Sequence, residues 1–114
     1  MHTLVVDDER EIAGLDGAVY ARTAAEAIDL LRTADGLDEL WLDHDLGDGG
    51  NGYAVASYLE RRAQAGSLLP IKRVVIHSMN PVGAQRMRRA LEQFYKIDIV
   101  PYASLSAGWS TSLD

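Results

Sequence analysis

The sequence predicts a doubly wound α/β domain with a parallel sheet of five strands. Short apolar runs rich in β-branched residues recur along the chain, segments with apolar residues at helical spacing follow most of them, and glycine, proline or capping residues mark the boundaries. A length of 114 residues suits one domain, and an apolar fraction of 47% suits a globular core.

The first two strands are expected at residues 4–6 and 18–21, with a short connection between them. A parallel crossover usually needs about a dozen residues or more, and Gly14 and Gly17 interrupt this segment. We therefore predict that the first helix is short or missing.

A helix is predicted to begin after Thr23, because Thr23 and Glu26 form the capping-box pattern. Gly36 would end this segment, and residues 40–42 would form the third strand. The apolar stripe of the helix comprises Ala24, Ala27, Ile28 and Leu31.

A second helix is predicted after the glycine-rich turn at residues 47–52, with Gly66 at its end. Pro70 breaks the following loop, and residues 74–76 would form the fourth strand. The stripe of this helix comprises Val55, Tyr58, Leu59 and Arg62.

Asn80 and Pro81 mark the start of the last helix, since asparagine is a good N-cap and proline suits the first helical position. Residues 97–100 would form the fifth strand, which Pro101 halts. The buried stripe of the helix would be Met87, Ala90, Leu91 and Phe94.

Alternating strands and helices of this number predict the flavodoxin-like strand order 2-1-3-4-5. We place one domain at residues 1–103 and a C-terminal tail at residues 104–114. The tail carries three large apolar residues, which we expect to dock on the sheet or to recruit a partner, a second copy included: Leu105, Trp109 and Leu113.

Polar residues follow three of the predicted strands, at residues 7–10, 43–47 and 77–81. In the predicted order the first, third and fourth strands are neighbours, and the carboxyl ends of parallel strands share one edge. We therefore expect these three segments to form one rim.

The rim would carry several carboxylates, which repel one another unless protons or a cation intervene. Hard oxygen donors favour a divalent ion, and we expect Mg²⁺ or Mn²⁺. Asp7 or Asp45 could instead cap the turn that follows it. The candidate metal ligands are Asp7, Asp8, Asp43 and Asp45.

Two imidazoles, His44 and His77, join Asp43 as the candidate catalytic groups. Near neutral pH an imidazole pair can act as general acid and base. The alternatives are that they bind a metal or are structural, and His2 is expected to be structural.

The candidate phosphate-binding residues are Ser78, Asn80 and Arg10. The helix that starts at Pro81 would offer free N–H groups and a dipole to an anion. Asn80 could instead simply cap this helix, and both roles can hold at once. Arg10 could neutralise developing negative charge, or form a salt bridge with a neighbouring carboxylate.

Composition and charge exclude several classes of protein. A net charge of −6 argues against broad nucleic-acid binding, although the basic residues of the second half leave a local patch as the alternative to solvated helix faces. The chain has no cysteine, no apolar run of about 20 residues and no signal-peptide pattern. We therefore expect a soluble cytoplasmic protein without a membrane-spanning segment. Residues 47–52 fit G-x-G-x-x-G, a pattern typical of dinucleotide-binding sites. We do not expect such a site, because the negative charge of Asp48 would repel a pyrophosphate.

At these residues the chain resembles a receiver domain, the phosphoacceptor module of two-component signalling. Val100 stands before Pro101 where receivers place a lysine, which argues against phosphoaspartate switching. The resemblance lies in the acidic pair after the first strand, the aspartate after the third and the hydroxyl after the fourth: Asp7, Asp8, Asp43 and Ser78.

The chain is more similar to the cyclic-phosphate-processing receiver domains, over about residues 3–100. The similarity rests on residues 7–10, 43–47, 52–53 and 77–83, and the two histidine-containing motifs are its specific part. It implies a receiver fold converted to a phosphoesterase-like site for cyclic phosphates of nucleotides or RNA ends.

We therefore predict a metal-dependent enzyme that processes a cyclic phosphate, in which His44 and His77 act as base and acid. The alternative is a degenerate receiver that binds metal or a nucleotide without catalysis and signals through a protein partner. A third hypothesis is a true phosphoacceptor at Asp43.

Overall fold

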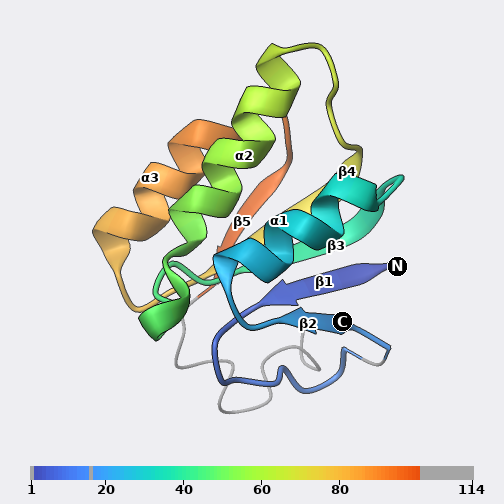
Figure 1. The fold of residues 1–114 in the computed structure, drawn as a ribbon. Coiled ribbons are helices and arrows are strands. Elements are labelled where there is room, and N and C mark those ends of the chain that lie inside the picture. The colour runs from blue at the N-terminus through green and yellow to red at the C-terminus, as the bar shows by residue number, and fades with distance from the viewer. Residues whose placement is uncertain (1, 16, 101–114) are drawn as a thin grey trace.

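The computed structural model describes residues 2–15 and 17–100, which form one parallel sheet of five strands in the order β2-β1-β3-β4-β5 (Figure 1). This confirms the predicted α/β class and strand order. The strands are β1 (Thr3–Val6), β2 (Val19–Ala21), β3 (Leu37–Leu42), β4 (Ile71–His77) and β5 (Ile97–Val100).

The helices are α1 (Ala24–Thr33), α2 (Gly52–Gln64) and α3 (Pro81–Leu91), and the short 3₁₀ turn η1 (Gly47–Gly49) precedes α2. Thr23 caps α1 as predicted, because its Oγ1 accepts the N–H of Glu26 at 3.0 Å. The returning bond of the capping box differs, since the Glu26 carboxylate accepts the N–H of Arg22.

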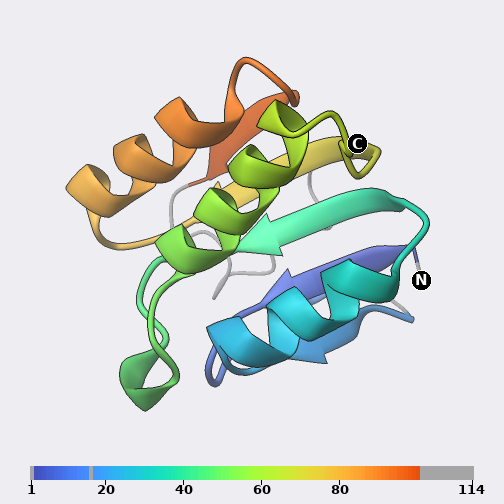
Figure 2. The same ribbon diagram turned by 45° about the horizontal axis from the view of Figure 1, so that its top comes forward.

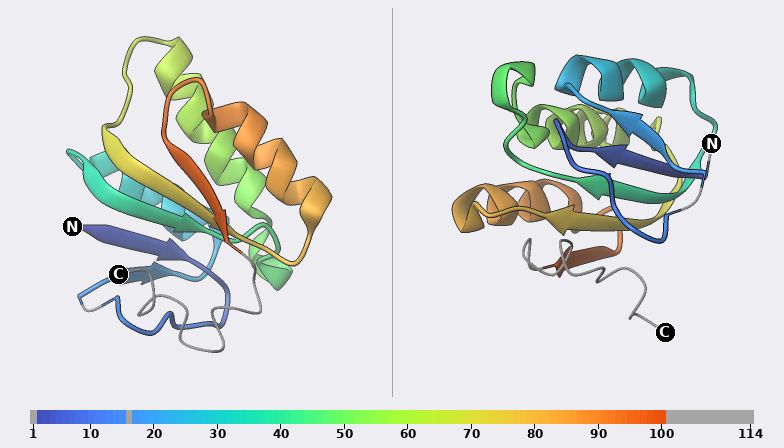
Figure 3. Two further views of the ribbon diagram at one scale, coloured as in Figure 1. Left: turned by 180° about the vertical axis from the view of Figure 1, so that it is seen from behind. Right: turned by 90° about the horizontal axis from the view of Figure 1, so that it is seen from below.

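All three helices pack on one face of the sheet (Figures 2 and 3). Their buried residues form one core with alternate strand residues, among them Leu4, Leu40 and Val74. The intervening strand residues point to the opposite face, where no helix lies in the described part of the chain.

The connection between β1 and β2 runs along this second face without a helix in its described residues, as the sequence predicted. Ile12 is buried there with Val5, Trp41 and Val75. The N–H of Ile12 donates to the Tyr20 hydroxyl at 3.1 Å, so the connection is held to β2 by a polar contact as well.

The strands β3 and β4 begin three residues earlier than the apolar runs predict. Ion pairs offset the charges of these added residues at the amino-terminal end of the sheet. Lys72 lies 3.1 Å from Asp38, and Arg73 lies 2.9 Å from Asp98. Apolar runs therefore locate the strands and cross-strand charge pairs lengthen them.

No helix in the described part of the chain is long and apolar enough to cross a membrane. The predicted halt at Pro101 and the predicted docking of Leu105, Trp109 and Leu113 lie outside the described residues.

Candidate functional site

Three buried polar residues meet where β1, β3 and β4 end. Asp7 and Asp43 directly follow their strands, and His77 is the last residue of β4. One carboxylate oxygen of each aspartate and one ring nitrogen of His77 all lie within 4.8 Å of one another. Asp7 and His77 have no exposed surface, and Asp43 is 4% exposed. We call these three residues the buried cluster.

The buried cluster lies on the sheet face that carries no described helix. Successive strand residues alternate between faces, and each member of the cluster stands two positions after Val5, Trp41 or Val75, which pack together on that face. The Trp41 and His77 rings are 6.0 Å apart between centroids. An apolar wall therefore adjoins the carboxylates on one side.

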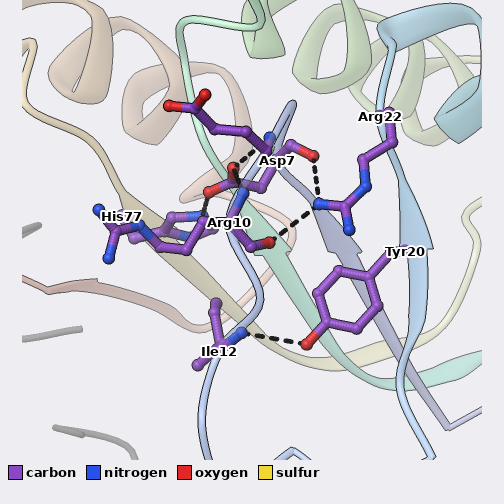
Figure 4. Close-up of polar contacts among 7 residues, drawn as sticks. Asp7, Arg10, Ile12, Tyr20, Arg22 and His77 are labelled. Carbon is purple, nitrogen blue, oxygen red and sulfur yellow. Dashed lines mark hydrogen bonds and ion pairs between the residues drawn. The ribbon is translucent and has the colours of Figure 1, made fainter. Parts of the chain in front are cut away.

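Asp7 is held as a carboxylate by hydrogen bonds (Figure 4). Its Oδ2 lies 3.1 Å from His77 Nε2, and its Oδ1 accepts the N–H groups of Glu9 at 3.1 Å and Arg10 at 2.7 Å. Burial raises the pKa of Asp7, but these contacts outweigh burial and the net pKa is lowered. Asp7 thus caps the turn after β1 and carries a buried negative charge.

Asp43 is shifted in the opposite direction. Burial, and next the negative charge of Asp7, raise the pKa of Asp43 to about 7, although the N–H groups of Asp45 and His44 lower it in part. Two neighbouring carboxyl groups therefore differ in protonation near neutral pH. Such a divergence is common at functional sites, where a proton or a cation can occupy the second group.

Asp43 opens onto an acidic hollow of about 230 Å³. Gly47 (φ +57°) brings its Cα close to the Asp8 carboxylate at the rim. The described lining of the hollow holds four carboxylates and no basic side chain. The lining residues are Asp8, Glu9, Asp43, Asp45, Gly47 and Met79. This set of hard oxygen donors fits a divalent cation of the Mg²⁺ or Mn²⁺ kind.

His44 follows a different course from His77. Its ring packs against Gly83 of α3, where any Cβ would overlap the imidazole, and its Nδ1 lies 3.0 Å from the Asp45 carboxylate. His44 comes two residues after Leu42, which points to the helix-covered face. The structure therefore groups His77 with the buried aspartates and places His44 against α3.

The predicted phosphate-binding residues make local backbone contacts. Ser78 Oγ accepts the N–H of Asn80 at 3.0 Å, and Asn80 Oδ1 accepts the N–H of Gly83 at 2.9 Å. Asn80 thus caps α3, as one of the two interpretations of this residue predicts. Arg10 donates its N–H to Asp7, and its carbonyl accepts a hydrogen bond from Arg22.

Two contributors to the site were not among the predicted site residues. Arg22 Nη1 donates to the carbonyls of Asp7 at 3.3 Å and Arg10 at 3.0 Å (Figure 4), which ties the turn after β1 to β2. Gly52 leaves room for the carbonyl oxygen of Asp43, with which a Cβ would collide, and donates its N–H to His44 at 2.7 Å. No signal in the sequence separates Arg22 from the other arginines, whereas Gly52 belongs to the family pattern at residues 52–53 without a role predicted for it.

The family model of the cyclic-phosphate processing receiver domain matches residues 2–93. The chain belongs to this family. The match covers β1 to α3 and includes all three polar segments, so it confirms the resemblance inferred from those residues. Among curated proteins, no relative matches the chain.

Within the cyclic-phosphate processing receiver family, the polar rim of this member divides into two parts. The buried cluster lies on one face of the sheet, and the His44–Asp45 pair lies beside α3. Asp43 belongs to the buried cluster and also lines the acidic hollow. Because it directly precedes His44 in the chain, it connects the two parts.

Proposed function

We propose that this domain is a metal-dependent phosphoesterase that processes a cyclic phosphate of a nucleotide or an RNA end. The observation that carries the proposal is the opening of Asp43, with its raised pKa, from the buried cluster onto the acidic hollow. Membership of a family described as cyclic-phosphate processing supports the choice of substrate.

The charge of the hollow supports a cation. A cyclic phosphate is an anion, and the carboxylates of the hollow would repel it unless a positive charge intervened. A divalent ion at this site would polarise phosphate oxygens and lower the pKa of a bound water. The residues proposed to hold it are Asp7, Asp8, Asp43 and Asp45.

The two imidazoles would have different tasks. His77 is fully buried with its Nε2 on Asp7, so it would act through Asp7 by fixing the orientation and charge of that carboxylate. The His44 side chain is 12% exposed beside the rim, so it would exchange the proton with the substrate. Asp45, bonded to His44 Nδ1, would hold the ring in position.

Ser78 and Arg10 would complete the site by orienting the phosphate. The Ser78 hydroxyl already accepts a bond from Asn80 and keeps a proton to donate. Arg10 stands on the turn that Asp7 caps, beside the acidic pair. Asn80 would contribute by keeping the start of α3 in place.

The test is turnover of 2′,3′-cyclic and 3′,5′-cyclic nucleotides, and of a short RNA that ends in a 2′,3′-cyclic phosphate, by the purified chain in Mg²⁺ or Mn²⁺. We expect one ring class to be opened, with activity lost in Asp43→Asn and His44→Ala. His2→Ala is the matched control, because His2 pairs with Asp38 at the other end of the sheet. Absence of turnover with either class and either metal would overturn the proposal.

A second function is favoured by the burial of Asp7 and His77, which leaves a substrate little direct access to two of the predicted site residues. It is a non-catalytic receiver that binds a metal or a nucleotide and signals through a protein partner. Calorimetric binding of the nucleotide without any turnover would identify this function instead.

A further inference from the structure

A groove between α2 and α3 carries positive charge outside the site described above. The two helices lie side by side (Figures 1 and 2) and enclose a space of about 300 Å³. The groove is lined by Tyr53, Glu60, Arg86, Arg89 and Ala90.

Both arginines of this lining, Arg86 and Arg89, are available to an anion. The Arg86 guanidinium lies 4.4 Å from the centroid of the Tyr53 ring, a cation–π distance, and the Arg86 residue is exposed. Within residues 2–15 and 17–100, neither Arg86 nor Arg89 is ion-paired with a carboxylate, whereas Arg88 pairs with Glu92. The two guanidinium groups outnumber the single carboxylate of the lining, Glu60, so in a protein of net charge −6 the groove keeps a local excess of positive charge.

The groove begins near the acidic hollow. Tyr53 directly follows Gly52, which contacts the backbone of Asp43 and His44. On α3, Arg86 stands one turn after Val82, about 6 Å further along the helix axis. The start of α2 therefore contacts the segment after β3 at Gly52 and lines the groove at Tyr53.

Exposed apolar side chains lie between the two features. Met79 is 75% exposed and lines the acidic hollow, and Val82 is 71% exposed on the first turn of α3. Both side chains leave apolar surface in contact with water. A flat, partly apolar group such as a nucleobase could cover them, which would remove apolar surface from water.

We propose that the α2–α3 groove is a second anion-binding subsite, which holds a backbone phosphate of a single-stranded RNA whose end lies in the acidic hollow. Arg86 and Arg89 would contact the phosphate, and Met79 and Val82 would contact the intervening base. This inference rests on the proposed function for the position of the RNA end. It makes a strand end, rather than a free mononucleotide, the substrate.

The test measures binding by fluorescence anisotropy, in Mg²⁺, of a short 5′-labelled single-stranded RNA with a plain 3′-phosphate, which the enzyme has no ring to open. We expect R86A/R89A to weaken binding about tenfold and to lower the salt dependence of log K by about 0.7, the value for one phosphate contact on a single strand. The control R32A/K72A removes two positive charges far from the groove and should bind as the parent does.

Equal affinity and equal salt dependence in R86A/R89A and R32A/K72A would overturn the subsite. The outcome is independent of catalysis, because the probe is not turned over. Loss of binding in R86A/R89A alone would support the subsite even if no cyclic nucleotide were ever opened. Turnover of cyclic nucleotides with unchanged RNA binding would leave the proposed function standing and remove this inference.

Discussion

Asp7 and Asp43 show how position alone can separate two chemically identical side chains. Asp7 accepts three hydrogen bonds and stays ionised, while Asp43 is buried beside that charge and has a pKa of about 7. The ionised Asp7 thus sets the protonation of its neighbour. In the absence of metal, the titration of Asp43 should dominate the change in the free energy of unfolding with pH in weakly acidic solution.

The first prediction concerns the pH dependence of the metal-free protein. The folded-state pKa of Asp43 is above its ordinary value of 3.8, so folding binds a proton and the free energy of unfolding falls as pH rises from about 4 to about 7. Asp43→Asn should remove this fall and stabilise the protein by roughly 2–4 kcal/mol at about pH 8. Urea unfolding in chelator at about pH 5.5 and about pH 8 measures both quantities.

Asp45→Asn is the control, because Asp45 is exposed at the same rim and should change stability little at either pH. A parent protein whose free energy of unfolding stays constant or rises between the two pH values would contradict the raised pKa of Asp43.

The second prediction concerns the partner of Asp7. His77→Ala would leave a fully buried carboxylate without its imidazole, which should cost about 3–5 kcal/mol of stability. In an Asp7→Asn background the same substitution should cost much less, because no buried charge remains to be stranded. A double-mutant cycle by urea unfolding measures this coupling, and additive costs would show that the Asp7–His77 contact is energetically unimportant.

At the scale of elements, the helices act as packing supports for the rim. At the start of α3, which Asn80 caps, Gly83 packs against the His44 ring. At the start of α2, Gly52 lies against the Asp43 carbonyl. Glycine is needed at both positions for the close approach of neighbouring atoms. These two contacts connect the helix starts to the segment that follows β3.

The third prediction tests this role of α3. Propensity alone would make Gly83→Ala stabilising by about 1 kcal/mol, but the new methyl group would overlap the His44 imidazole. We expect a net loss of about 1–3 kcal/mol and a displaced His44 ring, seen by urea unfolding and by the NMR signals of that imidazole.

Gln85→Ala is the matched control on the exposed face of the same helix, and it should leave both the stability and the His44 signals nearly unchanged. A stabilised Gly83→Ala with unmoved His44 signals would show that the ring is free to give way without cost.

At the scale of the whole molecule, the two ends of the sheet differ in charge. The acidic rim lies at the carboxyl end of the strands, and ion pairs neutralise the charged residues at the amino-terminal end. Asp38 there contacts both Lys72 and His2, whereas the lining of the acidic hollow has no basic side chain in the described residues. The asymmetry leaves the carboxyl edge as the place where a cation would relieve repulsion.

The fourth prediction follows from this asymmetry. If the proposed metal binds the rim, Mg²⁺ or Mn²⁺ should raise the unfolding temperature by several degrees at about pH 8, which corresponds to about 1–3 kcal/mol. The rise should be smaller at about pH 5.5, where the proton on Asp43 competes with the ion. Calorimetry or fluorescence-detected melting measures both shifts.

Asp43→Asn should abolish the metal-induced shift, and Asp38→Asn at the opposite end should retain it. A shift of equal size in all three proteins would assign it to general ionic strength and not to the rim.

The sequence by itself determined the order of the elements, the helix starts at Thr23 and Asn80, the missing first helix and the family. These features depend on neighbours a few residues apart: apolar spacing, capping side chains, and a connection too short and too rich in glycine for a regular crossover. The meeting of three polar segments also followed, because strand order places the ends of β1, β3 and β4 together.

Alternation along the chain already separates His44 from Asp43, and only the tertiary structure decided which partners each of these side chains meets. Strand alternation and register put His77 with Asp7 and Asp43, and put His44 against Gly83 of α3. The divergent pKa values of the two aspartates and the α2–α3 groove likewise arise from side chains distant in the sequence. Their physical cause is burial and proximity in three dimensions, which no local pattern encodes.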